Sequence, residues 1–231
     1  AILETLGTDS ETLVMGWMRD KDPKMRLLGV KAALHLRNEK FVGDLVRLVL
    51  VDHHTRTEAA TALLGFAAYG VVEFEPTSDN SKEVASVLTK AKREPLLKLL
   101  MSFLREDNAV IREIALYFLC LLPGLGSDIV QRAQNMANGD QVAAVRIAAL
   151  HFLKVRGRDV VYPVIRDILT DPTRNLLQKS ILKAAEEILE QVVPPEELDK
   201  AWEEIERRRQ KREELRARFE MDAESWRVEL D

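Results

Sequence analysis

Disulfide cysteines, long apolar runs and a large excess of charge of one sign are all missing from this chain. Its 231 residues include a single cysteine, Cys120, so no disulfide framework can form, which suits a reducing compartment. No apolar run reaches the roughly 20 residues of a membrane-spanning helix, and no signal peptide is present. The sequence starts at Ala1 without a methionine. We therefore expect a cytoplasmic protein, or a soluble fragment of a larger protein.

Aromatic residues and glycines are scarce as well. Aromatic residues make up 6% of the chain and glycines number ten, while 46% of the residues are hydrophobic. Sheets favour β-branched and aromatic residues and need many turns, so this composition favours helices around an apolar core. The length allows one large domain or two small ones.

The charges nearly cancel. There are 34 basic and 38 acidic residues, which leaves a net charge of −4. A protein that mainly holds nucleic-acid phosphates takes its affinity from Lys and Arg and should be clearly basic. The balance therefore argues against nucleic acid as the main partner and leaves local basic patches open.

The chain does contain an internal repeat, which is the strongest signal in it. Amphipathic stretches end near four aspartates, and a looser first copy precedes Asp20. Steps of three and four place the apolar or small residues at positions −10, −7 and −3 from each aspartate on one helical face. These residues are Val42, Leu45 and Val49 before Asp52; Leu97, Leu100 and Leu104 before Asp107; Val130, Ala133 and Ala137 before Asp140; and Val161, Val164 and Ile168 before Asp171.

A basic residue anchors the second helix of each expected pair, and small residues follow it. A small residue allows two helices to approach closely, and a larger one fills the space between layers. The fifth copy departs from this pattern with Leu182 and Glu186, as expected of a terminal repeat. The anchors are Arg26, Arg56, Arg112, Arg146 and Lys179; the residues three places later are Gly29, Ala59, Ala115 and Ala149; and those seven places later are Ala33, Leu63, Leu119 and Leu153.

One interval between anchors contains an insertion. The anchors are 30, 56, 34 and 33 residues apart, so the long interval holds one period plus extra residues at about 70–94. The insertion begins with GVVEFEPTSDNS, whose turn residues predict a mobile loop. It continues with a predicted helix over 82–93, after which Pro95 restarts the repeat.

Over roughly residues 11–192 the chain resembles the HEAT-like repeat family. The residues that carry the resemblance are D-x4-R at Asp107–Arg112, AVRIAAL at Ala144–Leu150, and the DP turns at Asp22–Pro23 and Asp171–Pro172. The resemblance implies an all-α solenoid of about five helical hairpins over residues 1–193, followed by a charged helix and tail over 194–231. It also implies a convex face of first helices, a concave face of second helices, and a structural ladder of turn aspartates and arginines. That ladder would include Asp107, Arg112, Asp140 and Arg146.

The C-terminal arm begins with Pro194-Pro195-Glu196-Glu197, a strong helix start. Leu198, Trp202 and Ile205 then form an apolar stripe that could cap the last repeat. Beyond them the chain is highly charged, and its tail carries more apolar residues than a solvated terminus needs. Both a solvated helix and a partner-binding helix are consistent with this composition. A partner-binding helix would contact its partner through Arg208, Arg212 and Trp226.

No motif requires chemistry. His53 and His54 are adjacent, so they do not share a helical face and are poorly placed to bind one metal ion; Asp52 is expected to cap the next helix instead. Gly124-Leu125-Gly126 is a turn after Pro123 and not a phosphate loop. We therefore expect no catalytic residues, no metal and no cofactor.

The leading functional prediction is a non-enzymatic protein-interaction scaffold whose partner is an unidentified protein or peptide. Five places after each anchor, the second helices carry Lys31, Thr61, Tyr117 and His151, with Lys154 one turn beyond His151. These polar residues lie between packed positions, so they are expected at the surface, and the resemblance implies that this stripe lies on the concave side. Tyr117 is expected to be its main anchor.

Other functions remain open at this point. The chain could be a regulatory module of a larger, perhaps membrane-attached protein. Some HEAT-like proteins resemble DNA glycosylases, which need a cationic groove, and others resemble bilin lyases, for which no bilin pocket is evident here. The oligomeric state is also left open.

Overall fold

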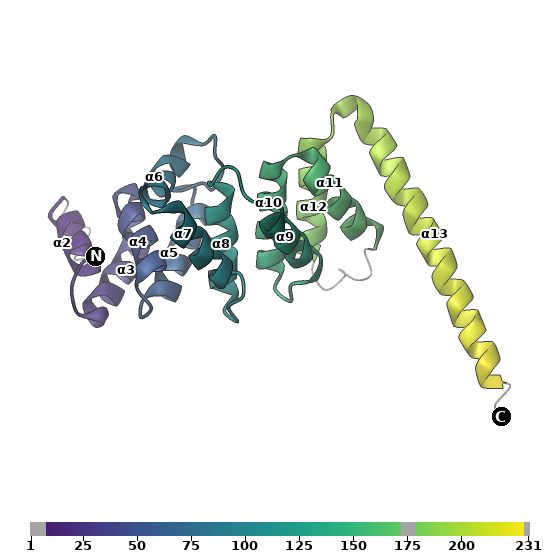
Figure 1. Ribbon diagram of the computed structural model, residues 1–231, viewed down its shortest axis with the longest axis horizontal. Helices are drawn as coiled ribbons and strands as arrows, with labels where there is room; N and C mark the ends of the chain where they lie inside the picture. Colours follow the sequence, from purple (N-terminus) through teal and green to yellow (C-terminus); the bar gives the residue numbers. More distant parts are fainter. Residues whose placement is uncertain (1–7, 172–178, 229–231) are drawn as a thin grey trace. The chain divides into compact units, whose positions relative to one another are not determined.

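The computed structural model describes residues 8–171 and 179–228, and the side chains of residues 10–171 and 179–218. Over these residues the chain is helical without any strand, which confirms the all-α prediction (Figure 1). None of the described helices is both long enough and apolar enough to cross a membrane. The α-helices are α2 (Thr8–Met18), α3 (Pro23–Leu36), α4 (Val42–Val51), α5 (Arg56–Ala68), α6 (Lys82–Lys90), α7 (Arg93–Phe103), α8 (Ala109–Cys120), α9 (Ser127–Gly139), α10 (Ala143–Arg156), α11 (Arg158–Thr170), α12 (Lys179–Val192) and α13 (Pro195–Val228), and the 3-10 turns are η1 (Glu39–Phe41) and η2 (Asp79–Ser81).

The chain divides into two compact units, residues 1–131 and residues 132–231. This division lies inside α9. Each unit is described below by itself.

In the first unit, successive helices pair and the second helix of each pair stacks on the next. Helix α2 packs on α3, α4 on α5 and α7 on α8, while α3, α5 and α8 pack in sequence. The small residues of the repeat lie at these contacts: Ala59 and Ala115 are fully buried, and a Cβ on Gly29 would lie 2.7 Å from the backbone nitrogen of Met18. Helix α3 therefore approaches α2 closely because position 29 has no side chain.

The insertion forms α6, which packs against α4. Its helix is shorter at the C-terminal end than the predicted range of 82–93, since α7 already begins at Arg93. The loop before it also differs from expectation, because Val72 and Phe74 are buried at 1% and 7% exposure. The turn-rich composition predicted mobility and gave no sign of these two apolar anchors.

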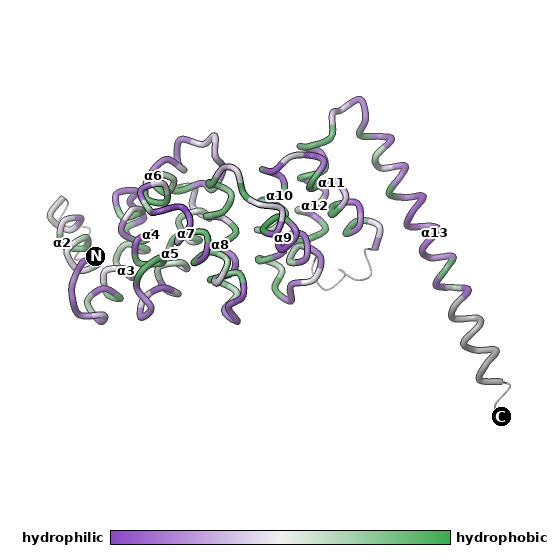
Figure 2. Tube along the Cα trace, in the orientation of Figure 1, coloured by the Kyte–Doolittle hydropathy of each residue, from purple (hydrophilic) through white to green (hydrophobic). Residues whose placement is uncertain are grey.

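In the second unit, α10, α11 and α12 pack against one another, and α13 packs on α11. Ala149 of α10 is fully buried, as its place in the repeat predicted. Figure 2 shows that most of the coloured part of α13 is hydrophilic, whereas α8 and α10 carry long hydrophobic stretches. Helix α13 therefore has little apolar surface with which to attach to the unit.

Local sequence signals explain several helix starts. Asp22 accepts a hydrogen bond from the backbone nitrogen of Lys24 at 2.9 Å, and Pro23 takes the first helical position of α3. Asn108 caps α8 in the same way through the nitrogen of Val110 at 3.0 Å. The first DP turn is thus a helix start, while Pro172 of the second one lies outside the described residues.

Candidate protein-interaction surface

The basic anchors of the repeat hold the two helices of a pair together. Each of four arginines donates hydrogen bonds to carbonyl oxygens at or after the end of the preceding helix. Those carbonyls have no partner within their own helix, and the negative end of the helix dipole favours a cation there. The contacts are Arg26 to Asp20 and Lys21 (3.0 and 2.8 Å), Arg56 to Val49 (2.9 Å), Arg112 to Glu106 and Asp107 (2.8 Å each) and Arg146 to Ala137 (2.7 Å). These arginines are structural, so they are unavailable to a partner.

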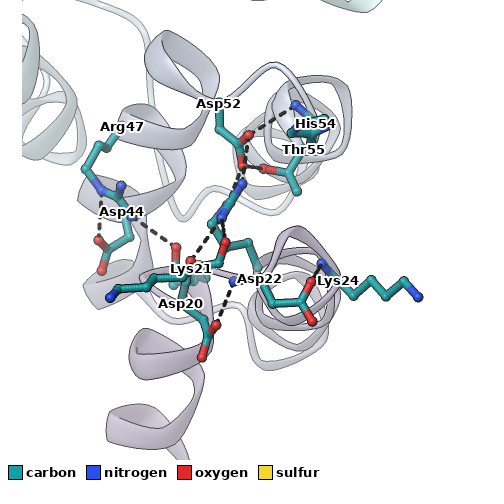
Figure 3. Close-up of polar contacts among 11 residues, drawn as sticks. Asp20, Lys21, Asp22, Lys24, Asp44, Arg47, Asp52, His54 and Thr55 are labelled. Carbon is teal, nitrogen blue, oxygen red and sulfur yellow. Dashed lines mark hydrogen bonds and ion pairs between the residues drawn. The ribbon is translucent and has the colours of Figure 1, made fainter.

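Asp52 connects neighbouring pairs in the first unit (Figure 3). Its carboxylate accepts two hydrogen bonds from Arg26 at 2.6 and 3.1 Å, one from the Thr55 hydroxyl at 2.5 Å and one from the His54 backbone nitrogen at 3.1 Å. The Arg26 guanidinium, opposed by burial, holds the pKa of Asp52 well below its ordinary value. Asp52 therefore bridges α3 and the α4–α5 turn and is not a simple cap of α5.

A second ion pair lies beside this one. Asp44, which is 7% exposed, accepts two hydrogen bonds from Arg19 at 3.0 Å each and pairs with Arg47 at 3.5 Å. The Arg47 guanidinium also donates to the carbonyl oxygen of Met18 at 3.0 Å. These contacts tie the end of α2 to α4. Nothing in the repeat pattern marked Asp44, because it lies outside the three apolar positions.

The predicted stripe of second helices is only partly exposed in the first unit. Lys31 of α3 and Thr61 of α5 are exposed, and the Thr61 hydroxyl donates to the carbonyl of Thr57 at 2.8 Å. Tyr117 of α8 is half-buried, because the ring of Phe74 stacks on it at 4.8 Å between centroids. Burial, and next the charge of Glu113, raises the pKa of the Tyr117 hydroxyl. The inserted loop therefore covers the residue that was expected to be the main anchor.

The remaining stripe residues belong to the second unit. His151 and Lys154 of α10 are half-buried, and the Lys154 ammonium donates to Gln191 of α12 at 2.9 Å. Lys154 thus helps to join α10 and α12. Since the two units are separate bodies, His151 and Lys154 are not placed against Lys31, Thr61 and Tyr117.

The C-terminal arm packs on α11, where Ala201 and Ile205 of α13 are buried. The sequence predicted that the stripe of Leu198, Trp202 and Ile205 could cap the last repeat, and α11 is the first helix of that repeat. Polar contacts dominate the attachment: Arg158 pairs with Glu197 at 2.5 Å, and Arg212 and Arg216 pair with Asp171 at 3.3 and 3.5 Å. Arg208 pairs with Glu204 one turn earlier at 3.0 Å, and the side chain of Trp226 lies outside the described residues.

An open groove of about 490 Å³ runs along α7 beside the start of α9, within the first unit. Leu97, Met101 and Ile129 supply its apolar surface. Charged residues of both signs surround them: Glu94 and Lys98 on α7, Arg105 in the turn after α7, and Asp128 on α9. Arg93 holds the α8–α9 turn beside the groove by donating to the carbonyl oxygens of Pro123 and Gly124.

Sequence reasoning missed this groove. The repeat pattern placed Leu97 on the packed face together with Leu100 and Leu104, which are indeed fully buried. Leu97 itself is only half-buried and lines the groove with Met101, one turn further along the same side of α7. The spacing of 94, 97, 98, 101 and 102 along α7, continued by 105 just after it, is a helical stripe that could have been found as a second amphipathic face.

In the part of the chain that the structure describes, no group of three His, Cys, Asp or Glu residues is arranged to hold a metal ion. Cys120 is buried, and both His53 and His54 are exposed. No family model, no curated protein and no solved structure matches this chain.

Proposed function

We propose that this protein is a non-enzymatic interaction scaffold built of HEAT-like helical hairpins, and that its α7–α9 groove receives an amphipathic segment of a partner protein. The observation that carries the proposal is the groove itself, in which half-buried Leu97 and Met101 and buried Ile129 form an apolar floor between charged residues. Apolar groups that line an open groove mark an interaction site more often than scattered surface residues do. The lone buried Cys120 fits action in a reducing, cytoplasmic environment.

The chemistry of the groove constrains the partner. Its apolar surface requires an apolar anchor such as Leu, Met or Phe, and a helix offers such anchors at positions i, i+3 and i+7. The rims carry two acidic residues, Glu94 and Asp128, and two basic ones, Lys98 and Arg105. Lys98 already pairs with Glu94 at 2.8 Å, which leaves Arg105 and Asp128 to select the charges of the partner.

The stripe of second helices is the weaker surface. Lys31 and Thr61 are exposed there. Tyr117, the residue expected to contribute most to binding, is stacked against Phe74. A partner would have to displace the inserted loop to reach Tyr117. The α7–α9 groove needs no such rearrangement.

A selection experiment tests the proposal. A displayed library of amphipathic helical peptides is enriched on the whole protein, and each enriched peptide is then measured against Met101→Glu. We expect that variant to abolish binding, because it places a charge in the apolar centre of the groove. Leu28→Glu is the matched control, since Leu28 is 44% exposed on α3 and lies outside the groove. Enriched peptides that bind Met101→Glu as well as the wild type would contradict the proposal.

One observation favours nucleic acid as an alternative partner. Residues 207–218 of α13 include seven basic and two acidic residues, a net charge of +5. Arg209, Arg212 and Arg216 of this set contact Leu169 or Asp171, and Arg208 pairs with Glu204. That leaves three exposed cations, Arg207, Lys211 and Arg218. Under this alternative a DNA or RNA oligonucleotide would bind with an affinity that falls steeply with salt. Arg207→Gln combined with Lys211→Gln would reduce the steepness of the plot of log K against log salt concentration by about two.

A further inference from the structure

A second site lies in the first unit, away from α7 and α9. It is an open cavity of about 380 Å³ where the end of α3 meets the beginning of the inserted loop. The walls come from three segments that are distant in sequence: residues 36–39, residues 70–71 and Asn80. Apolar Leu36 and Val71 lie beside charged and amide side chains in this open cavity.

Arg37 is the cationic wall of this cavity, and Tyr69 fixes its side chain. The guanidinium carbon lies 3.4 Å from the centre of the Tyr69 ring, which is itself 57% exposed. Stacking holds the planar guanidinium in one orientation while its N–H groups, at the edge, remain able to donate. No hydrogen bond or ion pair from that guanidinium to the described residues is formed, although Glu39 lines the same cavity.

The backbone of Arg37 is unusual in a way that favours a binding role. Its φ of 52° and ψ of 40° make it the one non-glycine residue with positive φ in the described ranges. Glycine or asparagine is the residue that normally ends a helix in this conformation, and another side chain there costs about 1 kcal/mol or more. An arginine at this position therefore sacrifices stability and supplies a cation to the cavity.

The other polar groups around the cavity are already committed. Asn38 donates to Glu11 at 2.6 Å and accepts from the backbone of Lys40, and the Lys40 ammonium pairs with the same Glu11 at 2.6 Å. The amide nitrogen of Asn80 donates to the carbonyl of Gly70 at 3.3 Å, which leaves its oxygen as an acceptor. The cavity thus presents the planar set of N–H donors of Arg37, the Asn80 amide oxygen as an acceptor, the Glu39 carboxylate and an apolar side.

We propose that this cavity binds the terminal carboxylate of a peptide chain. The carboxylate pairs with Arg37 through two parallel hydrogen bonds, the geometry that a guanidinium fork matches best. The last peptide N–H donates a hydrogen bond to the side-chain oxygen of Asn80, and an apolar terminal side chain lies against Leu36 and Val71. The carbonyl ends of α3 and α5 and the carboxylate of Glu39 oppose an anion here, so Arg37 supplies all of the electrostatic attraction for the carboxylate.

The site does not depend on the α7–α9 groove, and small probes can test it alone. N-acetyl-Ala-Leu carries a free carboxylate, while N-acetyl-Ala-Leu-amide is the same molecule without it. The two are titrated into the whole protein and followed by amide chemical shifts. We expect N-acetyl-Ala-Leu to shift the amides of Gly70, Val71 and Asn80, and the amide probe to bind at least about tenfold more weakly.

Variants of the cavity sharpen the test. Arg37→Gly suits the left-handed backbone, so it should fold at least as well as the wild type and lose binding. Arg37→Lys keeps the positive charge but loses the planar pair of N–H donors. Its affinity for N-acetyl-Ala-Leu should therefore lie between those of the wild type and Arg37→Gly. Glu39→Gln removes a repulsive charge and should bind the carboxylate probe about two to three times more tightly.

Three results would overturn the proposal. These are equal binding of the carboxylate and amide probes, unchanged binding in Arg37→Gly, and absence of shifts around the cavity. Inorganic phosphate is the third probe, and shifts from phosphate as large as those from N-acetyl-Ala-Leu would show a general anion site and not a peptide-terminus site.

Discussion

In the unit of residues 1–131 the inserted loop is held by buried apolar side chains, whereas in the unit of residues 132–231 helix α13 is attached largely by ion pairs. Val72 and Phe74 bury almost completely, and Phe74 stacks on Tyr117. Helix α13 buries Ala201 and Ile205 but relies on Arg158–Glu197 and the pairs at Asp171. Apolar burial is insensitive to salt, while exposed ion pairs are weak and screened. The insertion should therefore behave as part of its unit, and α13 as a separable arm.

The largest expected effect comes from removing the anchor of the insertion. Phe74→Ala should lower the free energy of unfolding by roughly 3 kcal/mol, since a buried aromatic ring is lost and a cavity remains. Chemical denaturation measures this loss, and limited proteolysis should then cut within residues 70–81, where the wild type resists. The neighbouring Glu73→Ala is the control, because Glu73 is exposed. Equal stability of both variants would show that the loop is not anchored.

The same variant should change the titration of Tyr117. Burial raises the pKa of this hydroxyl in the wild type, and the charge of Glu113 adds to the effect. Removing Phe74 admits water, so the pKa should fall toward its ordinary value. Tyrosinate absorbance in a background with Tyr69→Phe and Tyr162→Phe reports on Tyr117 alone. A pKa that stays high after the substitution would mean that Phe74 does not shield it.

Two glycines test the close packing of α2 on α3. In Gly29→Ala the new Cβ would lie 2.7 Å from the backbone nitrogen of Met18, so α2 must shift at a cost of about 1–3 kcal/mol. Gly16→Ala in α2 meets nothing within 4 Å and should gain up to about 1 kcal/mol from helix propensity. Thermal unfolding measures both, and a stabilising Gly29→Ala would contradict the packing.

Asp52→Asn should have a smaller effect that depends on pH. The folded-state pKa of Asp52 lies below its unfolded value of 3.8, so its ion pair with Arg26 contributes stability above that pH. As the pH falls below 3.8 toward the folded pKa, this contribution is lost. The difference in melting temperature between wild type and Asp52→Asn should thus be constant near neutral pH and shrink in acid. A difference that grows in acid would be incompatible with the pair.

The smallest expected effect concerns the attachment of α13. Glu197→Gln combined with Glu204→Gln should weaken the arm by up to about 1 kcal/mol, because the pairs with Arg158 and Arg166 are partly exposed. Hydrogen exchange in residues 195–212 should accelerate in the double variant, and in the wild type at high salt, while the insertion is unaffected. Equal salt sensitivity of both regions would remove the contrast between the units.

The sequence predicted the helices and several of their packed positions, because both follow from local periodicity. The arginine anchors and the small residues Ala59, Ala115 and Ala149 occupy the places that their spacing indicated. The contact of Phe74 with Tyr117 could not be predicted, since it joins segments 43 residues apart through a loop without periodicity. The left-handed backbone of Arg37 could not be predicted from the local sequence either, because arginine does not favour that conformation.

The most direct test of the proposed interaction surface is amide chemical-shift mapping with a peptide enriched on the whole protein. The largest shifts should fall on residues 94–105, in α7 and the turn after it, and on residues 126–129 around the start of α9, which line the groove. They should disappear in Met101→Glu and persist in Leu28→Glu. Shifts that fall instead on Lys31 and Thr61, or on α13, and survive in Met101→Glu would contradict the account.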